Sequence, residues 1–175
     1  MRHPGHDFWR YSLRKYREAG VESACLALQD QCGADVNLLL WCGWMAGRGI
    51  RLDKRRLRQA IARVHTWQAQ VVVPLRQARR ALRRLAPDVG LAGEDTREIY
   101  QRILGLELDL EYIEQTLLAD LAAAWPAPAR VDSPAKLARA SLARYLDCIG
   151  KARGPDDEPH LALLVQAFGR HPGSR

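Results

Sequence analysis

Apolar residues recur along most of this chain at intervals of three and four positions, the spacing that places side chains on one face of an α-helix. A β-branched run typical of a strand occurs only at 71–73, inside one of these helical patterns. The segment 37–46 is apolar on nearly every side, which is typical of a helix buried at the centre of a fold. The pattern predicts an all-α protein, a bundle of six to seven helices with this third helix buried.

The longest pattern predicts a helical hairpin. Apolar residues alternate spacings of four and three at positions 57, 61, 64, 71, 75, 78, 82 and 85, interrupted only by Gln68, and again at 99, 103, 106, 110, 113, 117 and 121. The short connector 86–93 makes the two helices, about 53–85 and 94–125, antiparallel neighbours with these positions as their seam. Pro74 lies inside the first of them, where the loss of one backbone hydrogen bond predicts a kink.

Capping residues suggest the remaining boundaries. Asp7 is expected to cap a first helix over 8–19, and Asp35 is expected to cap the buried third helix. Ser133 followed by Pro134 is a typical helix start, which predicts a sixth helix there. The assignments for the whole chain and its C-terminal part are one domain over 1–175, a polar linker at 151–159, a short last helix at 160–168 and a frayed tail at 169–175.

Charge is distributed unevenly along the chain. The formal net charge is +7 at pH 7. Residues 48–84 contain twelve basic residues and one acid, for a net of +11, whereas residues 85–132 contain three basic residues and ten acids, for a net of −7. One interpretation is structural, with a basic and an acidic helix neutralising each other across the hairpin. The other is that part of the basic face is left for a partner.

The end of the hairpin favours the second interpretation. Five arginines occupy one helical face at i, i+3, i+4, i+7 and i+8: Arg76, Arg79, Arg80, Arg83 and Arg84. The segment expected opposite them is nearly neutral, and the acids at 107–114 are expected opposite 63–71. An arginine fork donates two parallel hydrogen bonds to a carboxylate or phosphate. We therefore expect a non-enzymatic interaction or adaptor protein that docks an acidic protein partner on this face, with nucleic acid as an alternative ligand.

A second group of polar residues precedes the buried helix and is the candidate for chemistry. Gln29, Asp30, Asp35 and Asn37 lie within nine positions, beside an otherwise apolar segment. They are interpreted either as a buried polar network that fixes how two helices cross, or as a pocket of an enzyme or small-ligand-binding protein in which the two carboxylates act as acid and base or bind a cation. The first interpretation is favoured, because structural networks also gather carboxylates.

The chain contains no motif for a cofactor or a metal ion. It has no P-loop, no G-x-G-x-x-G, no G-x-S-x-G and no H-E-x-x-H, and its four cysteines, Cys25, Cys32, Cys42 and Cys148, form no C-x-x-C pair. We expect neither a cofactor nor a metal site, and free thiols in a reducing compartment. The polar start indicates no signal peptide, and the apolar run 38–46 is too short to span a bilayer, so the expected location is the cytoplasm.

The N-terminal residues resemble an uncharacterised proteobacterial family of unknown function. The resemblance is carried by Phe8-Trp9-x-x-Ser12-Leu13-x-x-Tyr16 and then by Gly20-Val21, Ala24-Cys25-Leu26-x-Leu28-Gln29-Asp30, Gly33 and Asp35-Val36-Asn37-Leu38-Leu39-Leu40. It is specific over residues 8–45, looser through Pro74-Leu75-Arg76, and weak beyond Trp125. It implies a bacterial cytoplasmic protein and no mechanism.

Overall fold

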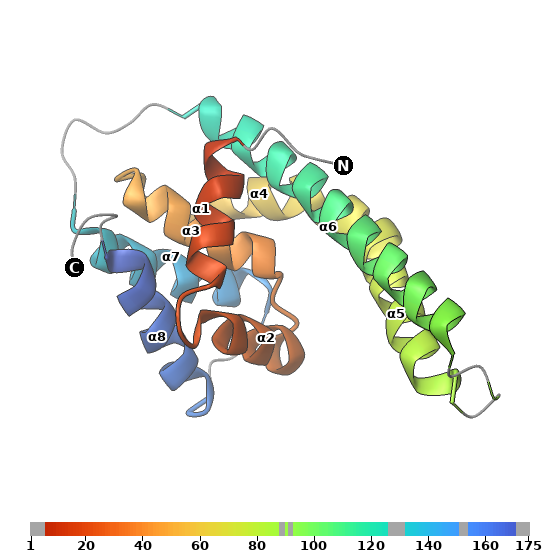
Figure 1. Ribbon diagram of the computed structural model, residues 1–175. Helices are drawn as coiled ribbons and strands as arrows, with labels where there is room; N and C mark the ends of the chain where they lie inside the picture. Colours follow the sequence, from red (N-terminus) through yellow and green to blue (C-terminus); the bar gives the residue numbers. More distant parts are fainter. Residues whose placement is uncertain (1–5, 88–89, 91–92, 126–131, 151–153, 171–175) are drawn as a thin grey trace.

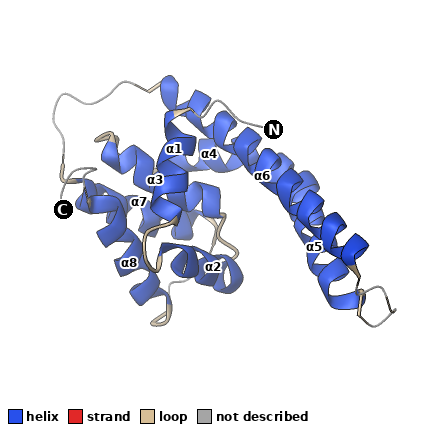
Figure 2. Cartoon of the chain, in the orientation of Figure 1, coloured by secondary structure: helices blue, strands red, loops and turns tan. Residues whose placement is uncertain are grey.

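The computed structural model describes residues 6–87, 90, 93–125, 132–150 and 154–170, and the regular structure in these ranges is helical (Figure 1, Figure 2). If the continuous rod of α4, η1 and α5 is counted once, the described residues form seven helices, which confirms the predicted all-α bundle. The elements are α1 (Asp7–Tyr16), α2 (Val21–Cys32), α3 (Val36–Gly47), α4 (Lys54–Trp67), the π-helical η1 (Gln68–Val72), α5 (Val73–Leu85), α6 (Glu94–Ala123), α7 (Pro134–Cys148) and α8 (Asp157–Gly169).

The core is built around α3, as its apolar sequence predicts. Leu39, Trp41 and Met45 are inaccessible to solvent, and α3 packs against α7 and α8 as well as α1 and α6. The indole Nε1 of Trp41 donates a hydrogen bond of 3.1 Å to the carbonyl oxygen of Leu118, which fixes α3 to α6. Much of the cover over α3 therefore comes from the C-terminal helices, while the hairpin contributes through α6.

The predicted kink at Pro74 takes the form of a widened turn. The backbone N–H of Val73 donates to the carbonyl of Gln68, five residues back, so one π-helical turn precedes the proline. Because proline has no N–H and crowds the preceding turn, a wider turn accommodates it without breaking the rod. The rod continues through Pro74 into α5.

The far end of the hairpin projects from the body formed by α1, α2, α3, α7 and α8 (Figure 1). There α5 packs mainly against α6 and η1, and none of its residues is buried. The predicted seam is only partly correct on α6, because Ile99, Leu106 and Ile113 are exposed on its surface. The body covers a different side of α6, which includes the buried Glu114 and Leu118.

Three predicted boundaries are wrong. The cap of α1 is His6, whose Nδ1 accepts the Trp9 N–H at 3.2 Å, and Asp7 lies in the first turn, where its negative charge favours the helix dipole. The same helix ends at Tyr16 and not at 19. The last helix begins at Asp157 and not at 160, so the final residues of the predicted linker 151–159 belong to α8. Pro159 does not prevent this, because it lies in the first turn of the helix, where the N–H groups have no helical partner.

The structure describes the first two residues of the predicted frayed tail, 169–175. Gly169 is still part of α8, and the Arg170 guanidinium lies 2.9 Å from the Glu18 carboxylate at the end of α1. This contact ties the end of α8 to the N-terminal helices. The rest of the predicted frayed tail, 171–175, and the first part of the predicted linker, 151–153, lie outside the described residues.

Candidate binding groove

A groove of about 350 Å³ separates the N-terminal helices from the hairpin. Its apolar residues come from four helices: Trp9, Leu13 and Tyr16 from α1, Leu26 from α2, Val36 and Leu40 from α3, and Leu104 and Leu108 from α6. Its polar residues are Ser12, Glu22, Gln29, Asn37, Arg76, Arg79, Arg80, Glu107, Glu111 and Gln115. The groove therefore combines a leucine-rich surface with a charged wall.

Helical spacing explains how each element reaches the groove. On α1, Trp9, Leu13 and Tyr16 follow i, i+4 and i+7, so one face of the helix lines the groove. On α6, Glu107, Glu111 and Gln115 are spaced by four and share a face in the same way. Leu13 on this face is exposed at the groove's edge.

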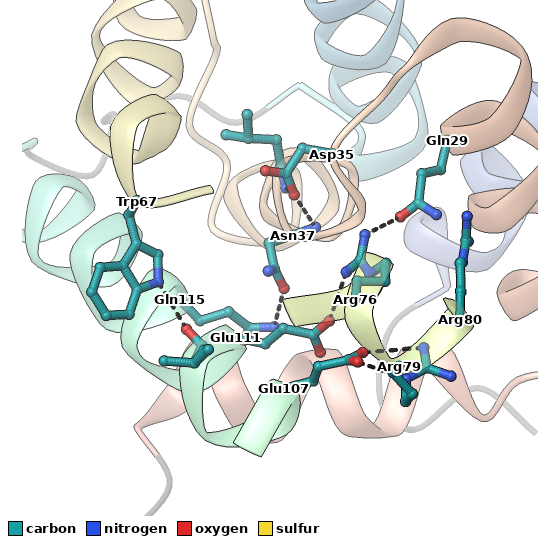
Figure 3. A network of polar contacts seen from close by, with 12 residues as sticks. Gln29, Asp35, Asn37, Trp67, Arg76, Arg79, Arg80, Glu107, Glu111 and Gln115 are labelled. Carbon is teal, nitrogen blue, oxygen red and sulfur yellow. Dashed lines mark hydrogen bonds and ion pairs between the residues drawn. The ribbon is translucent and has the colours of Figure 1, made fainter. Parts of the chain in front are cut away.

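Arg76 joins three helices at the groove wall (Figure 3). Its Nη1 donates to Gln29 Oε1 on α2 at 2.8 Å, and its Nη2 donates to Glu111 Oε1 on α6 at 3.0 Å. Burial raises the pKa of Glu111, although the adjacent Arg76 acts in the opposite direction. This arginine is thus a structural cross-link between α2 and the hairpin.

Arg79 is held still more tightly. Its Nε and Nη2 donate to the two carboxylate oxygens of Glu107 at 2.6 and 3.1 Å (Figure 3). Its Nη1 donates to the Tyr100 hydroxyl at 2.8 Å. Glu107 is buried, so the charge pair is largely withdrawn from water. The hydrogen bonds to Glu107 raise the pKa of Arg79, which remains charged.

The backbone of the acidic segment lies opposite 63–71 as predicted, since Trp67 Nε1 donates to the Leu110 carbonyl oxygen at 3.2 Å. The prediction was wrong in leaving the arginine face without acids, because the Glu107 and Glu111 side chains reach it. The reason is the direction of helical side chains, which lean toward the N-terminus of their own helix. In an antiparallel pair, arginine and glutamate side chains that start about two turns apart lean toward each other. Arg79 spans this offset to Glu107 while it also contacts Tyr100.

The other three arginines of the predicted face have different surroundings. Arg80 lines the groove and lies 4.0 Å from the exposed carboxylate of Asp30. Arg83 and Arg84 are exposed, and their spacing from Arg80 continues the same face toward the tip of the hairpin. The five-arginine array is thus divided into two internally paired residues and three that face solvent.

The candidate residues before α3 separate in a similar way. Gln29 and Asn37 line the groove, whereas Asp30 lies on the surface and Asp35 caps α3 by accepting the Asn37 N–H at 2.8 Å. Asn37 Oδ1 accepts a hydrogen bond of 2.8 Å from Gln115 Nε2 on α6 (Figure 3). Asp30 and Asp35 therefore do not meet in a pocket.

The carboxyl group of Glu114 on α6 adjoins Asp35. Glu114 is inaccessible to solvent, and burial, followed by the negative charge of Asp35, raises its pKa to about 11. The group is therefore protonated at neutral pH and can donate its own proton to Asp35. This pair of a buried and a half-buried carboxyl group supports the structural interpretation of Asp35, which was the favoured one.

Sequence reasoning missed much of the groove. It noted the acids of α6 but not that Glu107, Glu111 and Gln115 share a face, a spacing that the sequence already contains. Leu26 and Leu108 carried no signal of their own, since a leucine in a helix usually belongs to a core.

In the described ranges, His, Cys, Asp and Glu side chains form no group of three that could hold a metal ion, and no helix combines the length and hydropathy of a membrane crossing.

The fold and the groove define an all-α protein whose projecting helical hairpin forms a groove with the N-terminal helices. The chain belongs to the family DUF2390, described as a protein of unknown function, whose sequence profile matches residues 7–118. That range contains α1 through α5 and most of α6, and with them every residue that lines the groove. Neither the curated proteins nor the solved structures contain a match.

Proposed function

We propose that this protein is a non-enzymatic interaction protein that binds an acidic, leucine-containing helical segment of a partner protein in the groove. The observation that carries the proposal is the exposure of Leu13, Leu26 and Leu108, on three different helices, around one groove. An amphipathic helix that buries its apolar face in such a groove removes these side chains from water. Isolated exposed leucines are ordinary, but three at one concave site favour a binding surface.

The charge of the groove's margin supports an acidic partner. Arg76 and Arg79 are neutralised by Glu111 and Glu107, so they do not select a ligand by charge. Arg80, Arg83 and Arg84 remain exposed on the face that leads from the groove to the hairpin tip. Carboxylates of a bound helix would find guanidinium donors there.

Two synthetic peptides test the proposal. They share leucines at i, i+3, i+4 and i+7, and one carries glutamate and the other lysine at the remaining charged positions. We expect the glutamate peptide to bind at least about tenfold tighter in isothermal titration calorimetry, a difference of about 1.4 kcal/mol. Leu26→Glu and Arg83→Glu should each weaken the binding of the glutamate peptide. Arg139→Glu on α7 is the control and should leave it unchanged, because Arg139 does not line the groove.

The two peptides also distinguish the alternatives. Equal affinities, or a preference for the lysine peptide, would refute an acidic partner. Binding of a single-stranded oligonucleotide that falls steeply with salt and is lost in Arg83→Glu would instead support the nucleic-acid alternative. The surface that would contact the nucleic acid then contains only the three exposed arginines, so it is smaller than the predicted five-arginine face.

A second candidate function is the binding of a small apolar anion in the same groove. The volume of about 350 Å³ falls within the range of small-molecule sites. The polar groups that would meet such a ligand are Gln29, Asn37 and Arg80, without the Asp30–Asp35 pair. The fluorescent anion 1-anilinonaphthalene-8-sulfonate tests this candidate: binding with defined stoichiometry that Leu26→Glu abolishes supports it, and binding that is unchanged in this variant refutes it.

A further inference from the structure

The hairpin has an apolar surface along α6, on the side that does not line the groove. Ile99, Leu106 and Ile113 are spaced by seven residues along α6 and expose 46%, 53% and 42% of their surface. This spacing places them in one stripe, which spans about 21 Å at 1.5 Å per residue. The adjacent α5 has no buried residue although its sequence has a regular apolar face. The hairpin therefore resembles one half of a helical bundle.

Gly105 gives an independent indication that another helix approaches this stripe. It lies in the interior of α6, where glycine is among the least favourable residues. A Cβ atom at this position would meet nothing within 4 Å, so the described part of this chain does not require a glycine there. A residue without a side chain, next to Leu106, allows a second helix to come close to the α6 backbone.

The charges beside the stripe complement a second copy of the same helix. Arg102 and Asp109 flank the stripe on the side opposite to Glu107, which faces α5 through Arg79. If two α6 helices cross antiparallel at Leu106, Ile99 lies opposite Ile113 of the other copy and Arg102 lies beside its Asp109. The same contacts occur twice, because the spacing is symmetric about Leu106, as a two-fold interface requires.

We propose that the protein forms a homodimer in which the α6 helices of two copies pack antiparallel across Leu106. The three residues of the stripe are far fewer than the about 20–30 residues per side of a standard interface, so we expect a weak dimer with a micromolar dissociation constant. Association joins two hairpins into a four-helix arrangement and leaves the groove of each copy accessible. The proposal is independent of the ligand proposed for the groove.

Sedimentation velocity over a range of protein concentrations tests the dimer. The wild type should change from monomer to dimer as concentration rises through the micromolar range. Leu106→Glu should weaken association by at least about tenfold. Leu108→Glu is the matched control, since Leu108 is 46% exposed on the same helix but faces the groove. A monomer at every concentration, or equal weakening by the two variants, would overturn the proposal.

A charge exchange tests the orientation of the two copies. Arg102→Asp and Asp109→Arg should each weaken the dimer, and the double variant should restore it, because the exchanged charges meet again across the two-fold axis. A double variant as weak as the singles would overturn the antiparallel arrangement. Circular dichroism establishes that each variant is folded.

Cross-linking locates the axis directly. In a Cys148→Ser background, which removes the natural thiol that is only half-buried, Leu106→Cys should form a disulfide-linked dimer under mild oxidation. Leu108→Cys should remain monomeric under the same conditions. Cross-linking at 108 but not at 106 would place any self-association on the groove side and contradict the proposed interface.

Discussion

The buried carboxyl group of Glu114 should make the stability of the fold fall as pH rises. Its pKa is raised to about 11, chiefly by burial and then by the nearby charge of Asp35. In the unfolded chain the same group has an ordinary glutamate pKa and loses its proton in mildly acidic solution. Between these two values the folded protein holds one proton more than the unfolded chain. Because stability falls with pH wherever the folded state binds more protons, raising the pH favours unfolding.

The magnitude follows from one proton. A one-proton difference corresponds to about 1.4 kcal/mol per pH unit, so between about pH 6 and about pH 8 the contribution of Glu114 should fall by about 2.7 kcal/mol. Glu114→Gln preserves the shape of the group and a donor for Asp35 but has no proton to lose. Relative to the wild type, this variant should therefore gain about 2.7 kcal/mol over the same interval.

Urea unfolding followed by tryptophan fluorescence at several pH values measures this difference. Glu98→Gln, a change of an exposed glutamate on the same helix, is the control and should not gain stability relative to the wild type as pH rises. Parallel pH dependence of the wild type and Glu114→Gln would refute the reasoning, because it would mean that Glu114 binds no additional proton in the folded state.

Three further predictions concern packing at two glycines and the buried ion pair. Gly43→Ala should destabilise the fold by about 1–3 kcal/mol in urea unfolding, because overpacking is costly and the new Cβ would lie 2.5 Å from the Phe168 ring. Gly105→Ala, with open space around its Cβ, should instead stabilise the monomer by about 0.5–1 kcal/mol and weaken the proposed dimer. A stabilising Gly43→Ala or a destabilising Gly105→Ala would contradict these local environments. Arg79→Met should cost about 3–5 kcal/mol by leaving Glu107 buried without its partner, and adding Glu107→Met should recover most of the loss. A double variant as unstable as the single one would show that the pair contributes beyond its charges.

The sequence was sufficient for most of the fold because local signals agreed. The all-round apolar segment identified α3, and the paired seams with a short connector identified the hairpin. Caps were less decisive. Asp7 and His6 are adjacent possible caps of α1, and their choice depends on which side chain reaches the Trp9 N–H, a difference of one position that spacing alone does not contain.

The groove was less predictable because it depends on long side chains and on which face of α6 meets the body. Helical register predicted a nearly neutral segment opposite the five arginines, but it did not include the reach of arginine and glutamate side chains toward each other, which connects Arg79 to Glu107 as well as to Tyr100. Heptad spacing placed Ile99, Leu106 and Ile113 in the seam of the hairpin. It could not tell that α5 leaves this stripe exposed, since α6 is apolar on more than one face.

The two apolar surfaces of the hairpin make the two proposals separable by experiment. Leu108 lines the groove and Leu106 belongs to the stripe, two positions away and on the opposite side of α6. Between them, the fork of Arg79 and Glu107 holds α5 against α6, so a substitution on one surface leaves that connection in place. If Leu108→Glu weakens peptide binding alone and Leu106→Glu weakens the dimer alone, then one helix serves two independent contacts. If Leu106→Glu weakens peptide binding as well as the dimer while Leu108→Glu leaves the dimer intact, then the two surfaces are coupled, and dimer formation is part of how the groove binds.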